Sequence, residues 1–254
     1  MTATPARRFP CRGPDGGGNL RDPATIRVLI GCETSGQMRR AFLARGFDAW
    51  SCDILPADDP TNRHIRCDVR TILNDGWDML CVMHPPCTRL CNSGVRWLTE
   101  PPTNRQPDYP AEYEHWTRDE RLAWMWSDLD RGAALFSDCW NAPIPMRAVE
   151  NPVMHKHAKK RIRNYQPPAQ TVQPWWFGEK AFKATSFYLD GLPALTATNR
   201  LTPPAKGTKE HKLWSKVHRA SPGADRWKIR SATYPGIAAA AARQWGDQAL
   251  KVAS

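Results

Sequence analysis

From residue 26 onward, short apolar runs alternate with segments in which apolar side chains recur at helical spacing. The apolar runs predict strands over 27–30, 48–52, 64–69, 78–84 and 146–150. The helical spacing predicts helices from about 38 to 46, over 117–139 and over 155–163. Because strands and helices alternate, we expect an α/β fold with a mostly parallel sheet flanked by helices.

The remaining segments set the expected boundaries. Residues 171–177 and 184–189 have strand character, and a final helix is predicted from about 236 to 245. Residues 1–25, rich in Gly, Pro and Arg, predict a disordered basic arm. We therefore expect one domain over 26–254, with a proline-bearing insertion over about 95–116 and a polar, basic segment over 191–230.

Composition narrows the function classes. The formal net charge of +11 favours a polyanionic partner, and nucleic acid is the natural one. The eight cysteines lack zinc spacing, so we expect no metal site and read them as reduced thiols of a cytoplasmic protein. No apolar run is long enough for a membrane helix, and we see no signal peptide. Most of the twelve Trp residues are expected to pack in the core.

Polar residues follow the first strands in a suggestive order. The first strand runs into the turn 31–36, Gly-Cys-Glu-Thr-Ser-Gly, and a helix follows. The second strand ends in Asp53, and Asp68 lies at the end of the third. A strand, a glycine-bearing turn, a helix and a strand with an acidic end predict a Rossmann-type site for a nucleoside cofactor. We expect Glu33, Asp53 and Asp68 to hold that cofactor.

The fourth strand ends in His84-Pro85-Pro86-Cys87-Thr88, and the fifth ends in Glu150-Asn151-Pro152. A thiolate that adds to C6 of cytosine makes C5 nucleophilic toward a methyl donor. A buried carboxyl can remain protonated near pH 7 and stabilise charge at N3 of the ring. We therefore expect Cys87 as nucleophile, Glu150 as the acid at N3 and Asn151 as its support.

These segments, with Tyr234-Pro235-Gly236-Ile237 before the last helix, resemble the DNA cytosine-5 methyltransferase family, closest to a short, phage-borne branch. The resemblance covers roughly 26–190 and 230–247, and its specific part is Pro-Pro-Cys with Glu-Asn. It implies a Rossmann-like fold, S-adenosylmethionine as cofactor, DNA as partner with the cytosine flipped out of the helix, and the cytoplasm of a bacterial host. The implied cofactor residues are Gly31, Cys32, Glu33, Thr34, Ser35, Gly36, Asp53, Ile54, Asp68, Val69 and Pro85. The implied substrate residues are Pro86, Thr88, Arg89, Arg96 and Lys183.

The chain departs from the family in three respects. Its first loop is not Phe-x-Gly-x-Gly, Lys183 is the nearest substitute for a missing Gln-x-Arg-x-Arg motif, and no large target-recognition domain is present. The short segment 191–230 stands in its place, so sequence specificity is expected to be short or absent. DNA would then be held through its phosphates by the cationic side chains of this segment: Lys206, Lys209, Lys212, Lys216 and Arg219. Trp214 lies between these residues in the sequence.

Three alternatives remain open. The same site can act on a free cytosine nucleotide or RNA, transfer a group other than methyl from a modified donor, or belong to a non-catalytic nucleic-acid-binding protein. Cys87 stands where amino-methyltransferases carry an aromatic residue, which disfavours that class. We expect Cys91 to pack in the core and His155 and His157 to lie on the surface, and we assign no role to His84. The sequence does not fix the oligomeric state.

Overall fold

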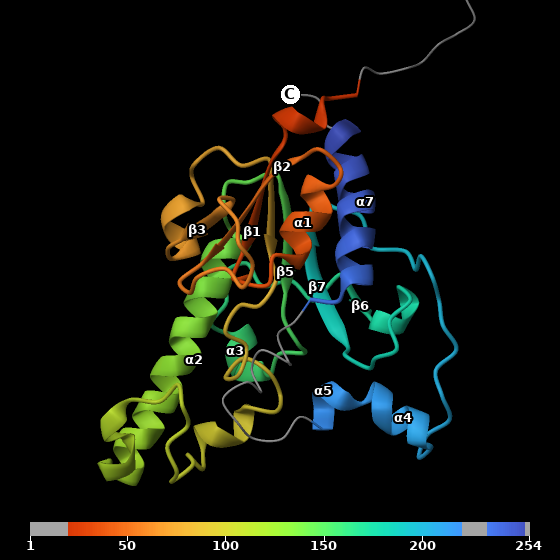
Figure 1. Ribbon diagram of the computed structural model, residues 1–254. Helices are drawn as coiled ribbons and strands as arrows, with labels where there is room; N and C mark the ends of the chain where they lie inside the picture. The colour runs from red at the N-terminus through yellow and green to blue at the C-terminus, as the bar shows by residue number, and fades with distance from the viewer. Residues whose placement is uncertain (1–19, 220–232, 252–254) are drawn as a thin grey trace, which may run out of the picture.

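The strands form one twisted sheet. The computed structural model describes residues 20–219 and 233–251, and over these ranges the sheet has seven strands in the order β3-β2-β1-β4-β5-β7-β6 (Figure 1). The strands are β1 (Arg27–Gly31), β2 (Asp48–Asp53), β3 (His64–Arg66), β4 (Met79–Val82), β5 (Met146–Glu150), β6 (Gln170–Val172) and β7 (Thr185–Asp190). The first five are parallel, whereas β7 is antiparallel to β5 and β6. The predicted mostly parallel α/β sheet is confirmed.

Helices cover both faces of the sheet. The α-helices are α1 (Gln37–Leu43), α2 (Arg118–Trp140), α3 (Lys156–Lys159), α4 (Lys209–Trp214), α5 (Lys216–Arg219) and α7 (Pro235–Lys251). Short 3-10 helices are η1 (Pro23–Thr25), η2 (Val69–Ile72), η3 (Val95–Leu98), η4 (Ala111–His115) and η5 (Pro174–Trp176). Helix α2 lies on one face, and α1 and α7 lie on the other (Figure 1). Thr117 and Glu120 form a capping box at the start of α2.

Successive side chains of the strands point to opposite faces of the sheet and pack in two apolar layers. Leu29, Leu80 and Val149 are buried against α2, whereas their neighbours Val28 and Met79 are buried on the face of α1 and α7. Each such large side chain contributes about 1.5–3 kcal/mol when it is fully buried. Because helices cover both faces of the sheet, a ligand can reach the sheet at the ends of its strands.

Three predicted elements differ from the structure for local reasons. β3 ends at Arg66 because Asp68 caps η2 by accepting a hydrogen bond from the Arg70 N–H (3.0 Å). Residues 174–176 form η5 rather than a strand, since Pro174 has no N–H for a sheet ladder. Helix α3 ends at Lys159, and the chain turns until Asn164 adopts a left-handed conformation with φ of 52°.

The insertion packs on the N-terminal half of α2. The Tyr113 hydroxyl donates to the Pro102 carbonyl (2.7 Å), and Tyr109 and Tyr113 pack on Trp124 with centroid distances of 4.7 and 5.8 Å. Residues 95–116 carry four acidic and two basic side chains, and all four acidic ones are exposed. The insertion lies beyond the carboxyl ends of the strands, on the opposite side from α4 and α5 (Figure 1).

The chain ends also bear on the predicted boundaries. Residues 1–19 of the predicted arm and 220–230 of the predicted recognition segment lie outside the described residues. Arg21, which we assigned to the arm, pairs with Asp78 (2.9 Å), and its N–H donates to the Leu250 carbonyl (3.0 Å). Among the described helices, none is both long and apolar enough to cross a bilayer.

Candidate active site

The strand order changes direction between β1 and β4, where the predicted loops begin. From β1 the chain passes through α1 to β2 on one side, and from β4 it passes through α2 to β5 on the other. Ligands of open α/β sheets bind at the carboxyl ends of the strands at such a switch point. The predicted cofactor loop leaves β1 here, and the Pro-Pro-Cys loop leaves the adjacent β4. The Met83 N–H donates to the Gly31 carbonyl (3.0 Å), which holds the two strand ends together.

The turn after β1 is closed around a buried carboxylate. Glu33 is fully buried, and its Oε1 accepts hydrogen bonds from Ser35 Oγ (2.6 Å) and the Met38 N–H (3.4 Å). Its Oε2 is buried and has no hydrogen-bond partner within the described residues. Burial raises the pKa of Glu33. An unpartnered buried carboxylate oxygen fits the positively charged amine of a ligand such as S-adenosylmethionine.

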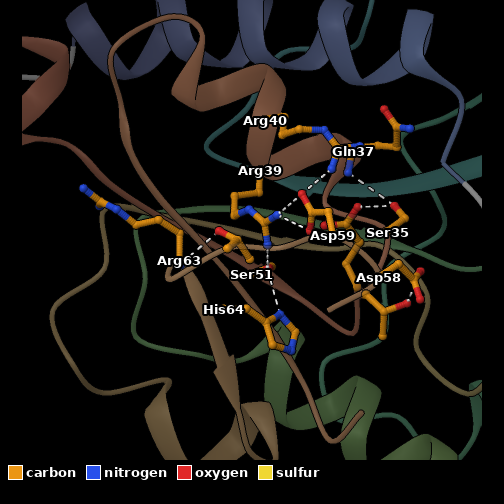
Figure 2. Close-up of polar contacts among 12 residues, drawn as sticks. Ser35, Gln37, Arg39, Arg40, Ser51, Asp58, Asp59, Arg63 and His64 are labelled. Atoms are coloured by element: carbon orange, nitrogen blue, oxygen red, sulfur yellow. Dashed lines mark hydrogen bonds and ion pairs between the residues drawn. The ribbon is translucent and has the colours of Figure 1, made fainter. Parts of the chain in front are cut away.

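A buried arginine fastens this turn to the loop after β2 (Figure 2). Arg39, 1 % exposed, pairs with Asp59 (2.6 Å) and donates to Ser51 Oγ (2.5 Å), which in turn contacts His64 Nδ1 (2.8 Å). Next to this pair, Thr34 Oγ1 donates to a carboxylate oxygen of Asp58 (2.9 Å), and the Asp58 N–H donates back to the Thr34 carbonyl (2.9 Å). The two loops that start at neighbouring strand ends therefore behave as one unit. Sequence reasoning missed Arg39 because nothing in the spacing of α1 links it to residue 59.

The other two predicted cofactor acids, Asp53 and Asp68, lie close to Cys32. Asp53 accepts the Leu55 N–H (2.9 Å), and burial raises its pKa. Asp68 is paired with Arg70, which lowers the Asp68 pKa. Burial, and then the negative charges of neighbours that include both aspartates, raises the pKa of the Cys32 thiol.

The other predicted cofactor positions surround the same turn. Ile54 is 67 % exposed beside Asp53, Val69 is buried against Gly31, and Gly36 takes a left-handed φ of 67° that suits glycine at the start of α1. Cys32 adopts a φ of 53°, a conformation that costs a non-glycine residue roughly 1–2 kcal/mol. Pro85 is buried at the end of β4.

The Pro-Pro-Cys loop is a tight turn with a partly exposed thiol. Pro86 and Thr88 are exposed, Cys87 is partly exposed, and the Cys87 carbonyl accepts the N–H groups of residues 90 and 91 (3.0 Å each). A side chain at Gly94 would place its Cβ 1.8 Å from the Thr88 carbonyl oxygen. Only glycine permits this close approach, so Gly94 keeps the loop folded back on itself.

The second predicted pair lies at the end of β5. Glu150 is 6 % exposed, and burial raises its pKa to about 7, while Lys183 lowers it. Asn151 is fully buried; its N–H donates to the Ser186 carbonyl (3.1 Å), and neither polar atom of its side chain has a partner within the described residues. The site thus contains a carboxyl that is half-protonated near pH 7 and a buried amide with unused hydrogen-bonding capacity.

Glu150 lines a small cavity at the start of α7. Its other lining residues include Lys183, Thr233 and His84, whose Nε2 contacts Thr233 Oγ1 (2.9 Å). Burial, and then the charge of Lys183, lowers the pKa of His84 well below its usual value. The cavity measures about 10 Å³, about the space of one water molecule, and Cys87 does not line it. A pyrimidine ring needs far more room than this cavity offers.

Backbone contacts join the loop after β4 to the loop after β5. Cys91 and Met154 form an antiparallel bridge, and the Asn92 N–H donates to the Val153 carbonyl (3.2 Å). His155 donates through Nε2 to the Arg89 carbonyl (2.6 Å). The prediction that His155 lies on the surface is wrong, because this hydrogen bond holds the ring inside; His157 is partly exposed.

The predicted substrate residues divide into two groups. Arg89 is buried: it pairs with Asp128 (3.2 Å) and donates to the Tyr109 hydroxyl (2.6 Å), so its position does not agree with the prediction that it binds substrate. Arg96 is exposed over the Trp97 ring (4.1 Å) and is open to a ligand. Lys183 is partly exposed beside Glu150, and Trp214 is buried against Phe182 and is not open to base stacking.

Neither a protein-family model nor a curated protein sequence matches this chain. Across residues 20–219 and 233–251, no group of three or more His, Cys, Asp or Glu side chains has a geometry that holds a metal ion.

Proposed function

We propose that the chain is an S-adenosylmethionine-dependent methyltransferase that modifies C5 of cytosine in DNA. The observation that carries the proposal is the buried carboxyl of Glu150, with a pKa of about 7, at the end of β5. Its neighbour β4 continues into the loop with the partly exposed Cys87 thiol. A nucleophile and a protonated acid on adjacent strand ends match what ring attack on a pyrimidine requires.

The chain's own residues divide the chemistry. The Cys87 thiolate forms a bond to C6 while Glu150 shares its proton with N3, so the added electron density at C5 is stabilised. Asn151, with an unpartnered side chain, is placed to hydrogen-bond the base or Glu150. S-adenosylmethionine supplies an electrophilic methyl group. After transfer to C5, loss of the C5 proton to a base expels the Cys87 sulfur from C6 as a thiolate, restores the aromatic ring and returns the shared proton to Glu150.

Three groups at the strand ends fit the cofactor. Glu33 Oε2 suits the amine of its methionine portion, Asp53 suits the ribose hydroxyls, and Asp68 suits the adenine amine. Asp68 is paired with Arg70. It would therefore accept a hydrogen bond from the adenine amine through carboxylate lone pairs that Arg70 does not use.

DNA recognition rests on charge. Residues 206–219 carry five Lys or Arg and one acidic side chain, and the Phe182 N–H donates to the Trp214 carbonyl (2.9 Å), which fixes this segment beside Lys183. With so little protein to read base edges, we expect short or absent sequence specificity and salt-sensitive binding. Duplex DNA must present its cytosine by base flipping.

The test is nucleoside mass spectrometry on plasmid from cells that express the chain. The native protein is expected to produce 5-methylcytosine, Cys87→Ala to produce none, and Cys91→Ala, a matched thiol in the same loop, to retain the activity. Purified protein given dCMP, RNA, single-stranded and duplex DNA identifies the substrate, and a product mass other than one methyl group identifies a modified donor. Cys87→Ala with full activity contradicts the proposal.

A further inference from the structure

A second cationic segment lies next to the candidate site. Residues 156–163 read Lys-His-Ala-Lys-Lys-Arg-Ile-Arg, with five cations and no acid, and all five cationic side chains are exposed. The segment consists of α3 and the turn after it, and it begins six residues after Glu150. Its role is not explained by the proposed chemistry.

The cations of this segment differ in their partners. Arg161 and Arg163 pair with Asp130 and Asp138 of α2, the latter at 2.8 Å. Within the described residues, no carboxylate lies at ion-pair distance from Lys156, Lys159 or Lys160. Three ammonium groups within five residues repel one another, and a polyanion relieves that repulsion.

His155 fixes the segment to the nucleophile loop. Its Nδ1 accepts the N–H groups of His157 and Ala158 in the first turn of α3 (3.2 Å each), so Nε2 carries the proton that it donates to the Arg89 carbonyl (2.6 Å). Its backbone N–H donates to the Leu90 carbonyl (3.1 Å). Because both ring nitrogens form hydrogen bonds, one to α3 and one to the loop of Cys87, the imidazole fixes the position of the lysines relative to that loop.

The charge distribution around the strand ends is uneven. Helix α3 and the pair α4–α5 both lie beyond the carboxyl ends of the strands, whereas the acidic insertion occupies the remaining side (Figure 1). Each cationic surface is attached to one part of the candidate site: residues 156–163 to the loop of Cys87, and residues 206–219 to the neighbour of Lys183.

We propose that residues 156–163 form a phosphate-binding surface for the nucleic-acid substrate, in addition to residues 206–219, with His155 as the positioning residue between that surface and Cys87. The inference rests on the proposed function only for the identity of the substrate. Because the contacts go to phosphate, they add affinity without adding sequence specificity.

The test compares two triple variants, Lys156→Gln/Lys159→Gln/Lys160→Gln and Lys206→Gln/Lys209→Gln/Lys212→Gln. Fluorescence anisotropy with a labelled 20-base-pair duplex gives the affinity between 50 and 200 mM salt. Three lost phosphate contacts lower the slope of log affinity against log salt by about 2.7, so the native protein loses about 40-fold more affinity than the variant over this range. All substituted side chains are exposed, so thermal unfolding is expected to be unchanged.

A first triple variant with the native salt slope overturns the surface, whatever the second variant shows. Reduced slopes without any methylated product support the surface and reject the proposed chemistry. His155→Asn keeps a helix-capping side chain but cannot reach the Arg89 carbonyl as the imidazole does. It is expected to keep native DNA affinity and to change the rate at which iodoacetamide alkylates Cys87. An unchanged alkylation rate overturns the positioning role.

Discussion

Replacement of Glu150 by Gln is expected to stabilise the protein at high pH. The Glu150 side chain is buried, and its pKa rises from 4.5 to about 7. A tenfold change in the ionisation constant corresponds to about 1.4 kcal/mol, so the folded protein opposes ionisation of this carboxyl by about 3 kcal/mol. Gln is nearly isosteric with the protonated acid and cannot ionise.

The pH window follows from linkage. Below about pH 4.5 the carboxyl is protonated in both the folded and the unfolded chain, so the native protein and Glu150→Gln have similar free energies of unfolding. As the pH rises from 4.5 to about 7, the unfolded chain ionises first and the native protein loses stability, whereas the variant does not. Above pH 7 Glu150 is ionised in both the folded and the unfolded native protein. The difference in the free energy of unfolding between the native protein and Glu150→Gln then stays near about 3 kcal/mol.

Urea unfolding followed by Trp fluorescence at pH 5, 6, 7 and 8 measures this difference. Glu112→Gln, at an exposed position of η4, is the matched control and should follow the native curve at every pH. Lys183→Met should extend the loss of protein stability to higher pH, because Lys183 favours the ionised form of Glu150 and its removal raises the Glu150 pKa further. Parallel pH curves for the native protein and Glu150→Gln would refute a raised pKa and, with it, the basis for a protonated acid at the site.

Three further predictions concern activity and loop stability. The methylation rate should fall as the pH rises through about 7, because Glu150 loses its proton there, and Glu150→Gln should show a rate at least about 10²-fold lower without that fall. Arg39→Ala should cost about 2–3 kcal/mol in urea unfolding, less than a fully buried pair because Asp59 is partly exposed, and should weaken cofactor binding by calorimetry. Arg40→Ala, which removes an exposed partner of the same aspartate, should cost less than about 1 kcal/mol. Gly94→Ala should displace the nucleophile loop, and native rates of both methylation and thiol alkylation would contradict that.

The sequence predicted the elements whose signal is local. The strands β1, β2 and β5 were located within one or two residues, since each contains a short group of buried apolar side chains whose signal is local. The strand predicted over 64–69 was too long because Asp68 caps the 3-10 helix η2. Aspartate is as typical of a cap as of the end of a strand, so the sequence did not distinguish the two. Helix α3 was predicted too long because basic residues favour helix and the turn before Asn164 has no glycine.

The contacts of the candidate site that join residues far apart in the sequence could not be predicted from the sequence. Arg89 and Asp128 are 39 residues apart, and only the packing of the loop on α2 reveals that the guanidinium is buried. His155 is not a usual capping residue, so no local signal indicated its two-sided role. Glu150 and Lys183 meet through the antiparallel pairing of β5 with β7, which the strand pattern alone does not specify.

The acidic insertion at residues 95–116 has a consequence for encounter with DNA. A polyanion that drifts toward that flank meets like charge and is turned away, whereas the opposite approaches draw it inward. Repulsion on one side therefore narrows the range of docking orientations before any specific contact forms. A protein with few base-reading side chains can in this way gain directional selectivity from the shape of its electric field.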